Sequence, residues 1–259
     1  MRNAEWKSFE LSGLQFIQHS KFIIASGSLA TMFVLGIDTA TQVASVGIIG
    51  NGETLAEESR QATSNHTETL LPLIASVLEQ ASISLTEIGG IGVSIGPGSF
   101  TGLRIALGTV KGFAYATGQK VVGVPTLEAL AHTVSDWEGL VCPVLDARKR
   151  EVYAALFRRD ANGTLQRLLP DHVLSPTALL EIITEPCLFL GDGAENYSAL
   201  ICEHGGSVMQ ILPFATHHPR GAIVAAMAWE RLRRGEHDEL HTLVPCYVRP
   251  PEAVLKRLA

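Results

Sequence analysis

Short apolar runs and longer amphipathic segments alternate along this chain. Apolar runs bounded by turn residues are typical of strands, and apolar positions three and four apart are typical of helices. From Met32 onward the pattern predicts three strands joined by tight turns, and then helix, strand, helix, strand and helix. The expected strands are the run from Met32, Ala44–Ile49, Thr54–Glu58, Ile91–Ile95 and Lys120–Val124, and the expected helices are Ser64–Ala81, Leu103–Ala116 and a segment from Thr126 to near Val134.

The same order of elements then begins again. Strands are expected at Leu140–Asp146, Glu151–Arg158, Gln166–Val173 and Cys187–Leu190, with helices at Pro176–Ile183 and Glu195–Glu203. Two copies of a βββαβα arrangement predict an α/β fold of two related lobes, each a mixed sheet with helices on its faces. A further helix, Ala222–Arg233, is apolar on one side, and we expect it to pack on the first lobe.

The pattern also predicts how the chain is divided. Residues 1–31 carry no recognisable motif and form either a disordered extension or the product of an upstream start site. The first lobe is expected to comprise residues 32–136 plus 215–235, and the second lobe residues 137–214. Residues 236–259 read as a polar, proline-containing tail.

Charge and cysteine content narrow the classes of function. The 259-residue chain has a net charge of -6 at pH 7 and a pI near 5.8. A protein that binds RNA or DNA by itself needs a basic face, so this balance argues against a self-sufficient nucleic-acid binder. The four cysteines form no CxxC pair, which indicates neither a zinc site nor a disulfide framework and favours the reducing cytoplasm. No stretch approaches the roughly eighteen apolar residues of a membrane span.

The glycine-rich stretch Gly96-Pro-Gly-Ser-Phe-Thr-Gly-Leu-Arg104 follows a predicted strand and precedes a predicted helix. Backbone N–H groups at a helix N-terminus favour an anion, and Arg104 adds a guanidinium one turn inside the helix. The alternative is a tight turn that only holds the strand and the helix together, capped by Ser99 or Thr101. The Asp38-Thr39 pair at the end of the first strand also has two interpretations. It suits a phosphate bound through a metal or a water molecule, or a capped turn.

The helix predicted at Ser64–Ala81 has a wider apolar set than one stripe. A helix of this kind lies between layers or presents one face to another subunit. His66 and Glu68 are expected at its exposed beginning.

Residues that would carry catalysis are hard to find. His237 and His241 have a metal-ligand spacing, but Gly235 and Pro245 around them favour a solvated loop. Ser99 lacks the GxSxG context of a nucleophile. Asp38 and Asp146 each end the first strand of a lobe, where they face one another across a cleft or serve as structural twins. The run Arg148-Lys149-Arg150 reads as an exposed hairpin tip.

Several motifs together resemble the bacterial TsaB family. These are Leu35-Gly-Ile-Asp-Thr-Ala-Thr41, His66-Thr-Glu-Thr-Leu-Leu-Pro72, the glycine-rich stretch up to Arg104, Asp146-Ala-Arg-Lys-Arg-Glu-Val-Tyr153 and Tyr247-Val-Arg249. The resemblance runs from Met32 almost to the end of the chain. It implies the actin, hexokinase and sugar-kinase fold. It also implies a non-catalytic subunit that binds TsaD, the enzyme that transfers a threonylcarbamoyl group to N6 of the adenosine beside the anticodon of ANN-decoding tRNAs.

The resemblance further implies that the TsaE ATPase joins the complex, that tRNA is reached only indirectly, and that the chain forms a homodimer when TsaD is absent. TsaD-like relatives carry two metal-binding histidines four residues apart on the helix that matches Ser64–Ala81. Here Leu70 follows His66 at that spacing, so no metal and no catalytic residue are expected. The expected partner interface is His66, Glu68, Leu70, Leu71, Leu73 and Ile74. A vestigial nucleotide or phosphate loop is expected at Asp38, Thr39, Gly96, Gly98, Ser99, Thr101 and Arg104, where ATP or ADP would lodge at the shared interface.

Two other functions compete with the subunit. A free-standing sugar or acetate-type kinase would use the cleft, and the second-lobe turn Gly191-Asp-Gly-Ala194 is then its only candidate adenine or phosphate loop. A glycoprotease-like hydrolase would need a metal pair or a nucleophile, and the sequence presents neither.

Overall fold

The computed structural model describes residues 32–62 and 66–248. The predicted extension 1–31, the first two residues of the helix predicted from residue 64 and the end of the predicted tail lie outside these residues. Within them, no helix has both the length and the apolar character needed to cross a membrane.

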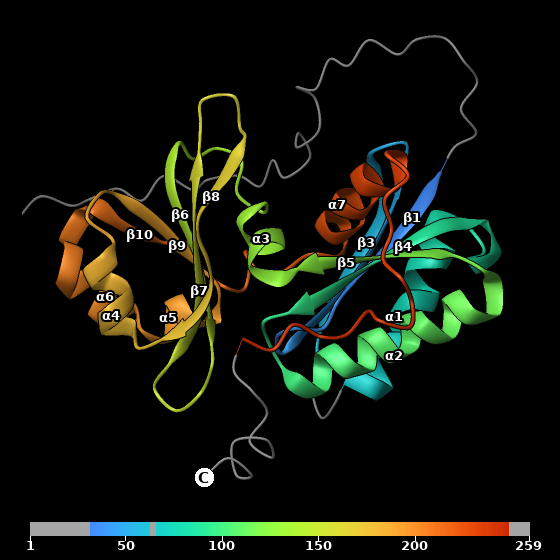
Figure 1. The fold of residues 1–259 in the computed structure, drawn as a ribbon, viewed down its shortest axis with the longest axis horizontal. Coiled ribbons are helices and arrows are strands. Elements are labelled where there is room, and N and C mark those ends of the chain that lie inside the picture. Colours follow the sequence, from blue (N-terminus) through green and yellow to red (C-terminus); the bar gives the residue numbers. More distant parts are fainter. Residues whose placement is uncertain (1–31, 63–65, 249–259) are drawn as a thin grey trace, which may run out of the picture. The chain divides into compact units, whose positions relative to one another are not determined.

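The first sheet has five strands in the order β3-β2-β1-β4-β5 (Figure 1). They are β1 (Phe33–Asp38), β2 (Val43–Gly50), β3 (Glu53–Gln61), β4 (Ile88–Gly96) and β5 (Lys120–Pro125). Strands β1 to β3 pair antiparallel, whereas β4 is parallel to both β1 and β5. Asn51 and Gly52, which join β2 to β3, both have positive φ angles, 52° and 88°, as a two-residue hairpin turn requires.

Helices cover both faces of this sheet. Helices α1 (His66–Ala81) and α2 (Phe100–Thr117) pack with Leu35 and Ile37 of β1 in one core. Helix α7 (Gly221–Arg233) packs on the opposite face, with Val34 in a second core (Figure 1). Neighbouring strand residues point to opposite faces, so β1 supplies both cores. A Cβ at Gly36 would lie 2.1 Å from the carbonyl oxygen of Gly221, which explains how α7 packs so closely. The packing predicted for this helix is confirmed.

The second sheet repeats the arrangement in the order β10-β9-β6-β7-β8. Strands β6 (Gly139–Asp146), β7 (Val152–Arg159) and β8 (Leu165–Leu174) pair antiparallel in sequence. Strand β9 (Cys187–Leu190) is parallel to β6, and β10 (Met209–Ile211) is parallel to β9. The helices of this half are α4 (Pro176–Ile182), α5 (Asp192–Asn196) and α6 (Ser198–Gly205), and 3-10 turns lie at Leu85–Glu87 and Gly206–Val208. The duplicated order confirms the predicted α/β fold of two related lobes.

One local prediction for the second half was wrong, and one strand was missed. The single helix expected at Glu195–Glu203 is two helices, α5 and α6, which meet at Tyr197. Strand β10 was not predicted, because three residues are too few to show a period.

Helix α3 (Thr126–Ala131) contributes to the cores of both sheets. Leu127 and Leu130 belong to the core that contains Phe157 of β7, and Ala129 belongs to the core that contains α7. The guanidinium of Arg159 also donates a hydrogen bond to the carbonyl oxygen of Ala131 at 3.2 Å. The two sheets therefore share buried apolar contacts through α3.

The segment after α7 is tied to the first sheet. The Asp238 amide donates to the Val121 carbonyl at 2.8 Å, and its carboxylate accepts from the Gly123 amide at 2.7 Å. Leu243 is buried in the core of α1 and α2. This segment is therefore anchored to the first lobe at Asp238 and Leu243, whereas the sequence pattern suggested only a polar tail.

Candidate functional site

The ends of β1 and β4 meet because carboxyl ends of parallel strands lie at one edge of a sheet. The Ser99 amide donates to the carbonyl oxygen of Ala40 at 2.7 Å, and the Thr39 hydroxyl donates to the carbonyl oxygen of Gly102 at 2.8 Å. The turn after β1 and the glycine-rich turn after β4 are thus bonded directly to each other.

The glycines allow this close approach. A Cβ at Gly102 would lie 2.0 Å from the Thr39 carbonyl oxygen, and a Cβ at Gly98 would lie 2.4 Å from that of Ala40. Any other residue would force the two turns apart.

The amides of the glycine-rich turn donate within the chain. Gly96 donates to the Thr126 hydroxyl at 3.1 Å, and Gly102 donates to the Ser99 hydroxyl at 3.2 Å, which makes Ser99 the N-cap of α2. With the Ser99 amide, three donors of the expected phosphate loop already have protein partners. The geometry favours the alternative in which the turn holds β4 and α2 in place.

Asp38 is completely buried in this site. Its Oδ1 accepts from the Ala40 amide at 3.0 Å, and Oδ2 has no hydrogen-bond partner among the described residues. Burial raises the pKa of Asp38 from 3.8 to about 6, while the nearby Ser94 hydroxyl and the Ala40 amide lower it by less. Because Asp38 and Thr39 are both inaccessible to solvent, neither contacts a ligand outside the protein in this conformation.

The exposed part of the predicted loop is an aromatic and guanidinium cluster. The Arg104 guanidinium lies 4.1 Å from the centre of the Phe100 ring, and Arg104 Nε donates to the Tyr247 hydroxyl at 3.1 Å. The rings of Phe100 and Tyr247 stack with centroids 5.2 Å apart. Sequence reasoning placed Arg104 beside an anion but did not find this cluster, although both Arg104 and Tyr247 stood in the motifs.

His66 does not form a metal site. It is buried at the start of α1, where its Nε2 lies 2.9 Å from the Thr41 carbonyl oxygen, and burial lowers its pKa. Leu70, which stands at the second ligand position, is 1% exposed and belongs to the core. The residues present therefore do not fit the metal of TsaD-like relatives. The described residues also contain no other group of three or more His, Cys, Asp or Glu side chains placed to hold a metal.

The structure corrects the predicted partner interface on α1. Leu70, Leu73 and Ile74 are buried in the chain's own core, as is His66 at the helix start, so these side chains do not reach a partner. Leu71 points the other way and is 53% exposed, and Glu68 is also exposed. The wide apolar set is therefore explained mainly by the sheet beneath the helix.

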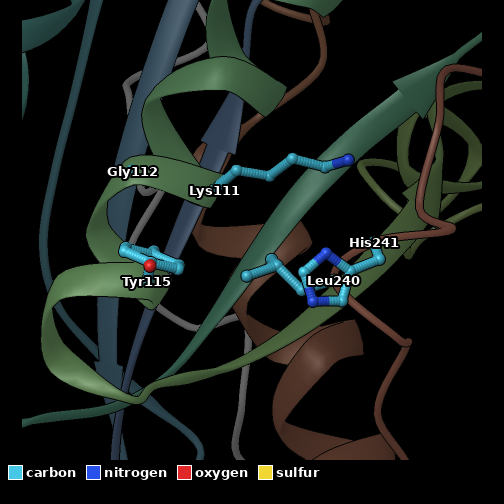
Figure 2. Close-up of a pocket in the computed structure, with 5 residues that line it drawn as sticks. All are labelled: Lys111, Gly112, Tyr115, Leu240 and His241. Atoms are coloured by element: carbon cyan, nitrogen blue, oxygen red, sulfur yellow. The ribbon is translucent and has the colours of Figure 1, made fainter.

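Helix α2 has an exposed stripe that the sequence reasoning missed. Gly108 and Gly112 lie on it, and a Cβ added to either glycine would meet no atom within 4 Å, while Tyr115 is 84% exposed. Lys111, Gly112 and Tyr115 of α2 line a groove of about 370 Å³ together with Leu240 and His241. Figure 2 shows the Lys111 and Tyr115 side chains projecting from α2, with Leu240 and His241 opposite. The available signal was the spacing of four between the two glycines, which puts them on one helix face.

The turn after β9 in the second lobe, which begins at Gly191, is also bonded to the chain's own atoms. The Asp146 amide donates to Asp192 Oδ1 at 3.0 Å, and a Cβ at Gly191 would lie 2.2 Å from the Val144 carbonyl oxygen. Burial raises the pKa of Asp192. This turn, the candidate adenine or phosphate loop of the competing kinase function, is packed against the end of β6.

The remaining candidates do not assemble into a site. His237 and His241 are both exposed, and the segment between them forms a bridge and a turn rather than a helix, so their spacing does not place them on one face. Among the described interactions, none joins Asp38 to Asp146, whose carboxylate instead accepts from the Arg148 amide at 2.8 Å.

The duplicated topology defines a two-lobed α/β protein in which the chain's own atoms close the glycine turn of each lobe. Residues 57–257 match the family described as TsaD, tRNA N6-adenosine threonylcarbamoyltransferase. The tRNA threonylcarbamoyladenosine biosynthesis protein TsaB of Bacillus subtilis is 31% identical over 228 residues, which are 87% of this chain and 97% of the relative. TsaB of Escherichia coli is 36% identical over 152 residues, 58% of this chain and 65% of the relative.

Solved structures agree with these relatives. A Pseudomonas aeruginosa crystal structure, described as an uncharacterized protein with similarity to peptidase YeaZ, superposes with a TM-score of 0.70 at 27% identity. The match covers 85% of this chain and 100% of the Pseudomonas aeruginosa chain. The chain belongs to the TsaB family, as the motifs predicted.

Proposed function

We propose that this chain is a non-catalytic subunit in the cytoplasmic biosynthesis of threonylcarbamoyladenosine in tRNA. In this role it binds and activates TsaD in a complex that also involves TsaE, and TsaD brings the main tRNA contacts. The names of the relatives and the TsaD family match support this assignment.

One observation carries the proposal. On α1, the position that needs a second metal ligand holds Leu70, which is buried in the core, while the next residue, Leu71, is 53% exposed. Leu71 is exposed, and the neighbouring glycine-rich turn has amides that are bonded within the chain. This arrangement suits docking of a partner better than catalysis.

The proposed docking surface combines the exposed faces of α1 and α2. It consists of Glu68, Leu71, Arg104, Gly108, Gly112 and Tyr115. The two glycines let a partner helix approach the backbone of α2 closely, and Leu71 and Tyr115 supply apolar area. When TsaD is absent, we propose that a second copy of this chain covers the same surface.

We also propose that ATP or ADP lodges at the shared interface. The amides of Gly96, Ser99 and Gly102 are occupied, so the exposed Thr101 and Arg104 side chains are the contacts that this chain would offer. Isothermal titration with ATP, for the single chain and for the complex, tests this. Heat of binding in neither sample would end the nucleotide proposal.

The subunit role is tested with TsaD from the same organism. We expect the chain to co-purify with TsaD and threonylcarbamoylation of tRNA to require it. Leu71→Asp places a charge on the docking surface and should abolish both. Leu168→Asp is the matched control, because Leu168 is a similarly exposed leucine, 43%, on β8 of the other lobe. Co-purification that survives Leu71→Asp would refute the proposed surface, and modification without this chain would refute the function.

A further inference from the structure

A basic hairpin tip stands apart from the rest of this acidic chain. Arg148, Lys149 and Arg150 join β6 to β7, and all three are exposed. The three residues have positive φ angles of 62°, 54° and 62°. The docking surface on α1 and α2 does not include them.

The backbone of the tip would suit other residues better. A left-handed conformation costs free energy for residues with a Cβ, and glycine and asparagine largely avoid that cost. Here three long basic side chains occupy consecutive left-handed positions. Strain of this kind, when the surroundings hold it in place, is found at functional sites.

The surroundings do hold the tip in place. The Arg148 amide donates to Asp146 Oδ1 at 2.8 Å, and the Asp146 amide is itself held by Asp192. The Ala147 amide donates to the Glu151 carbonyl at 3.0 Å, and the Glu151 amide donates to the Arg148 carbonyl at 3.0 Å. The three basic side chains therefore extend from a fixed turn.

Arg148 differs from other arginines of the chain in the length of its ion pair. Arg158 pairs with Glu185 at 2.7 Å, and Arg234 pairs with Glu236 at 2.9 Å. Arg148 approaches Asp146 only at 3.6 Å, and its side chain is 87% exposed. An ion pair this exposed is weak, so the guanidinium can turn to another anion at little cost.

We propose that Arg148, Lys149 and Arg150 contact the phosphate backbone of tRNA in the complex with TsaD. The inference rests on the proposed function and refines it, since tRNA would otherwise be reached only indirectly. Three adjacent cations on a narrow tip suit successive phosphates of one strand. The net charge of -6 keeps the chain from holding RNA by itself, so the tip adds a contact to those that TsaD makes.

The test measures tRNA binding by the assembled complex. Fluorescence anisotropy with a labelled ANN-decoding tRNA is recorded between 50 and 200 mM salt, a range over which phosphate contacts change affinity by roughly 10³ to 10⁵ when six to ten are made. The variant is Arg148→Asn, Lys149→Asn and Arg150→Asn combined. Asparagine tolerates the left-handed backbone, so the turn is kept while three charges are removed. The control combines Arg60→Gln, Lys120→Gln and Arg234→Gln, which removes three exposed charges from the first-lobe strands and the end of α7.

We expect the tip variant to bind tRNA about tenfold or more weakly, with a salt slope reduced by roughly 2 to 3, whereas the control keeps both. Equal affinity and slope in the two variants would overturn the inference. Loss of TsaD or TsaE from the complex, with unchanged tRNA affinity, would also overturn it and assign the tip to an acidic protein surface. If the wild-type chain does not assemble with TsaD, the proposed function fails and this inference falls with it. If the complex assembles and modifies tRNA normally, and the tip variant binds tRNA as the wild type does, only this inference fails.

Discussion

Arg104 and Tyr247 are hydrogen-bonded at 3.1 Å although 143 residues separate them. Arg104 lies in the first turns of α2, and Tyr247 lies in the segment that follows α7. The neighbouring Cys246 amide donates to the Ile95 carbonyl at 2.7 Å, so the segment is fixed beside the end of β4. Two of the family motifs thus meet at the N-terminus of α2, next to the proposed docking surface.

Tyr247→Ala should weaken this connection more than Tyr247→Phe. The alanine removes both the stacking on Phe100 and the hydroxyl, and we expect a loss of about 1 kcal/mol in the free energy of unfolding. The phenylalanine keeps the stacking and should cost about half as much or less. Urea unfolding measures both. Tyr115→Ala serves as the control, since an 84% exposed side chain should change little, and a larger effect there would contradict the assignment.

Asp38 should make stability depend on pH. Its pKa is raised from 3.8 to about 6 in the folded state, so between these values the folded protein binds more protons than the unfolded chain. Stability therefore falls as pH rises through this window, by roughly 2 to 4 kcal/mol for this group. Asp38→Asn removes that slope. Urea unfolding of both proteins from pH 4 to pH 7 checks it, and parallel profiles would show that burial does not shift this group.

Substitutions at two nearby leucines of α1 should distinguish effects on stability from effects on binding to TsaD. Leu73→Ala opens a cavity in the core and should cost about 2 to 5 kcal/mol, because Leu73 is 0% exposed. Leu71→Ala should change stability by no more than about 0.5 kcal/mol. Unfolding of the isolated chain and co-purification with TsaD are measured for each. A destabilised Leu71→Ala protein would mean that this side chain also supports the fold.

These leucines show where sequence reasoning succeeded and where it stopped. The period of apolar residues predicted the helix, and the repeated element order predicted two matching sheets. Periodicity does not say which apolar residues meet the chain's own sheet, so Leu70 and Leu73 were assigned to a partner although the sheet covers them. That choice depends on the helix rotation, which tertiary packing sets.

The glycine-rich turn shows a second limit. Its residue types suit an anion and a close backbone approach equally well, so the sequence left both open. The choice depends on Thr39 and Ala40, which are distant in the sequence but bond to this turn. Only the fold brings these atoms together.

Two glycines of α2 should respond to alanine in opposite ways. A Cβ at Gly102 would lie 2.0 Å from the Thr39 carbonyl oxygen, so Gly102→Ala should destabilise the chain by about 1 to 3 kcal/mol. A Cβ at Gly112 meets nothing within 4 Å, so Gly112→Ala should stabilise the isolated chain by about 0.5 to 1 kcal/mol, through its better helix propensity. Urea unfolding of the two variants beside the wild-type chain measures both changes, and a shift in the same direction for both would contradict this difference.

The same Gly112→Ala protein tests the docking surface without damaging the fold. A methyl group on the exposed stripe of α2 would hold a partner helix away from the backbone, so affinity for TsaD should fall while stability rises. Gly118→Ala is an unsuitable control because Gly118 has a φ angle of 76° and ends the helix. Ala116→Ser is a better one, since it changes an exposed position near the end of α2 by a single hydroxyl. A gain in stability with unchanged affinity for TsaD would show that the partner does not approach α2 at Gly112, and the docking surface would then reduce to the α1 side around Leu71.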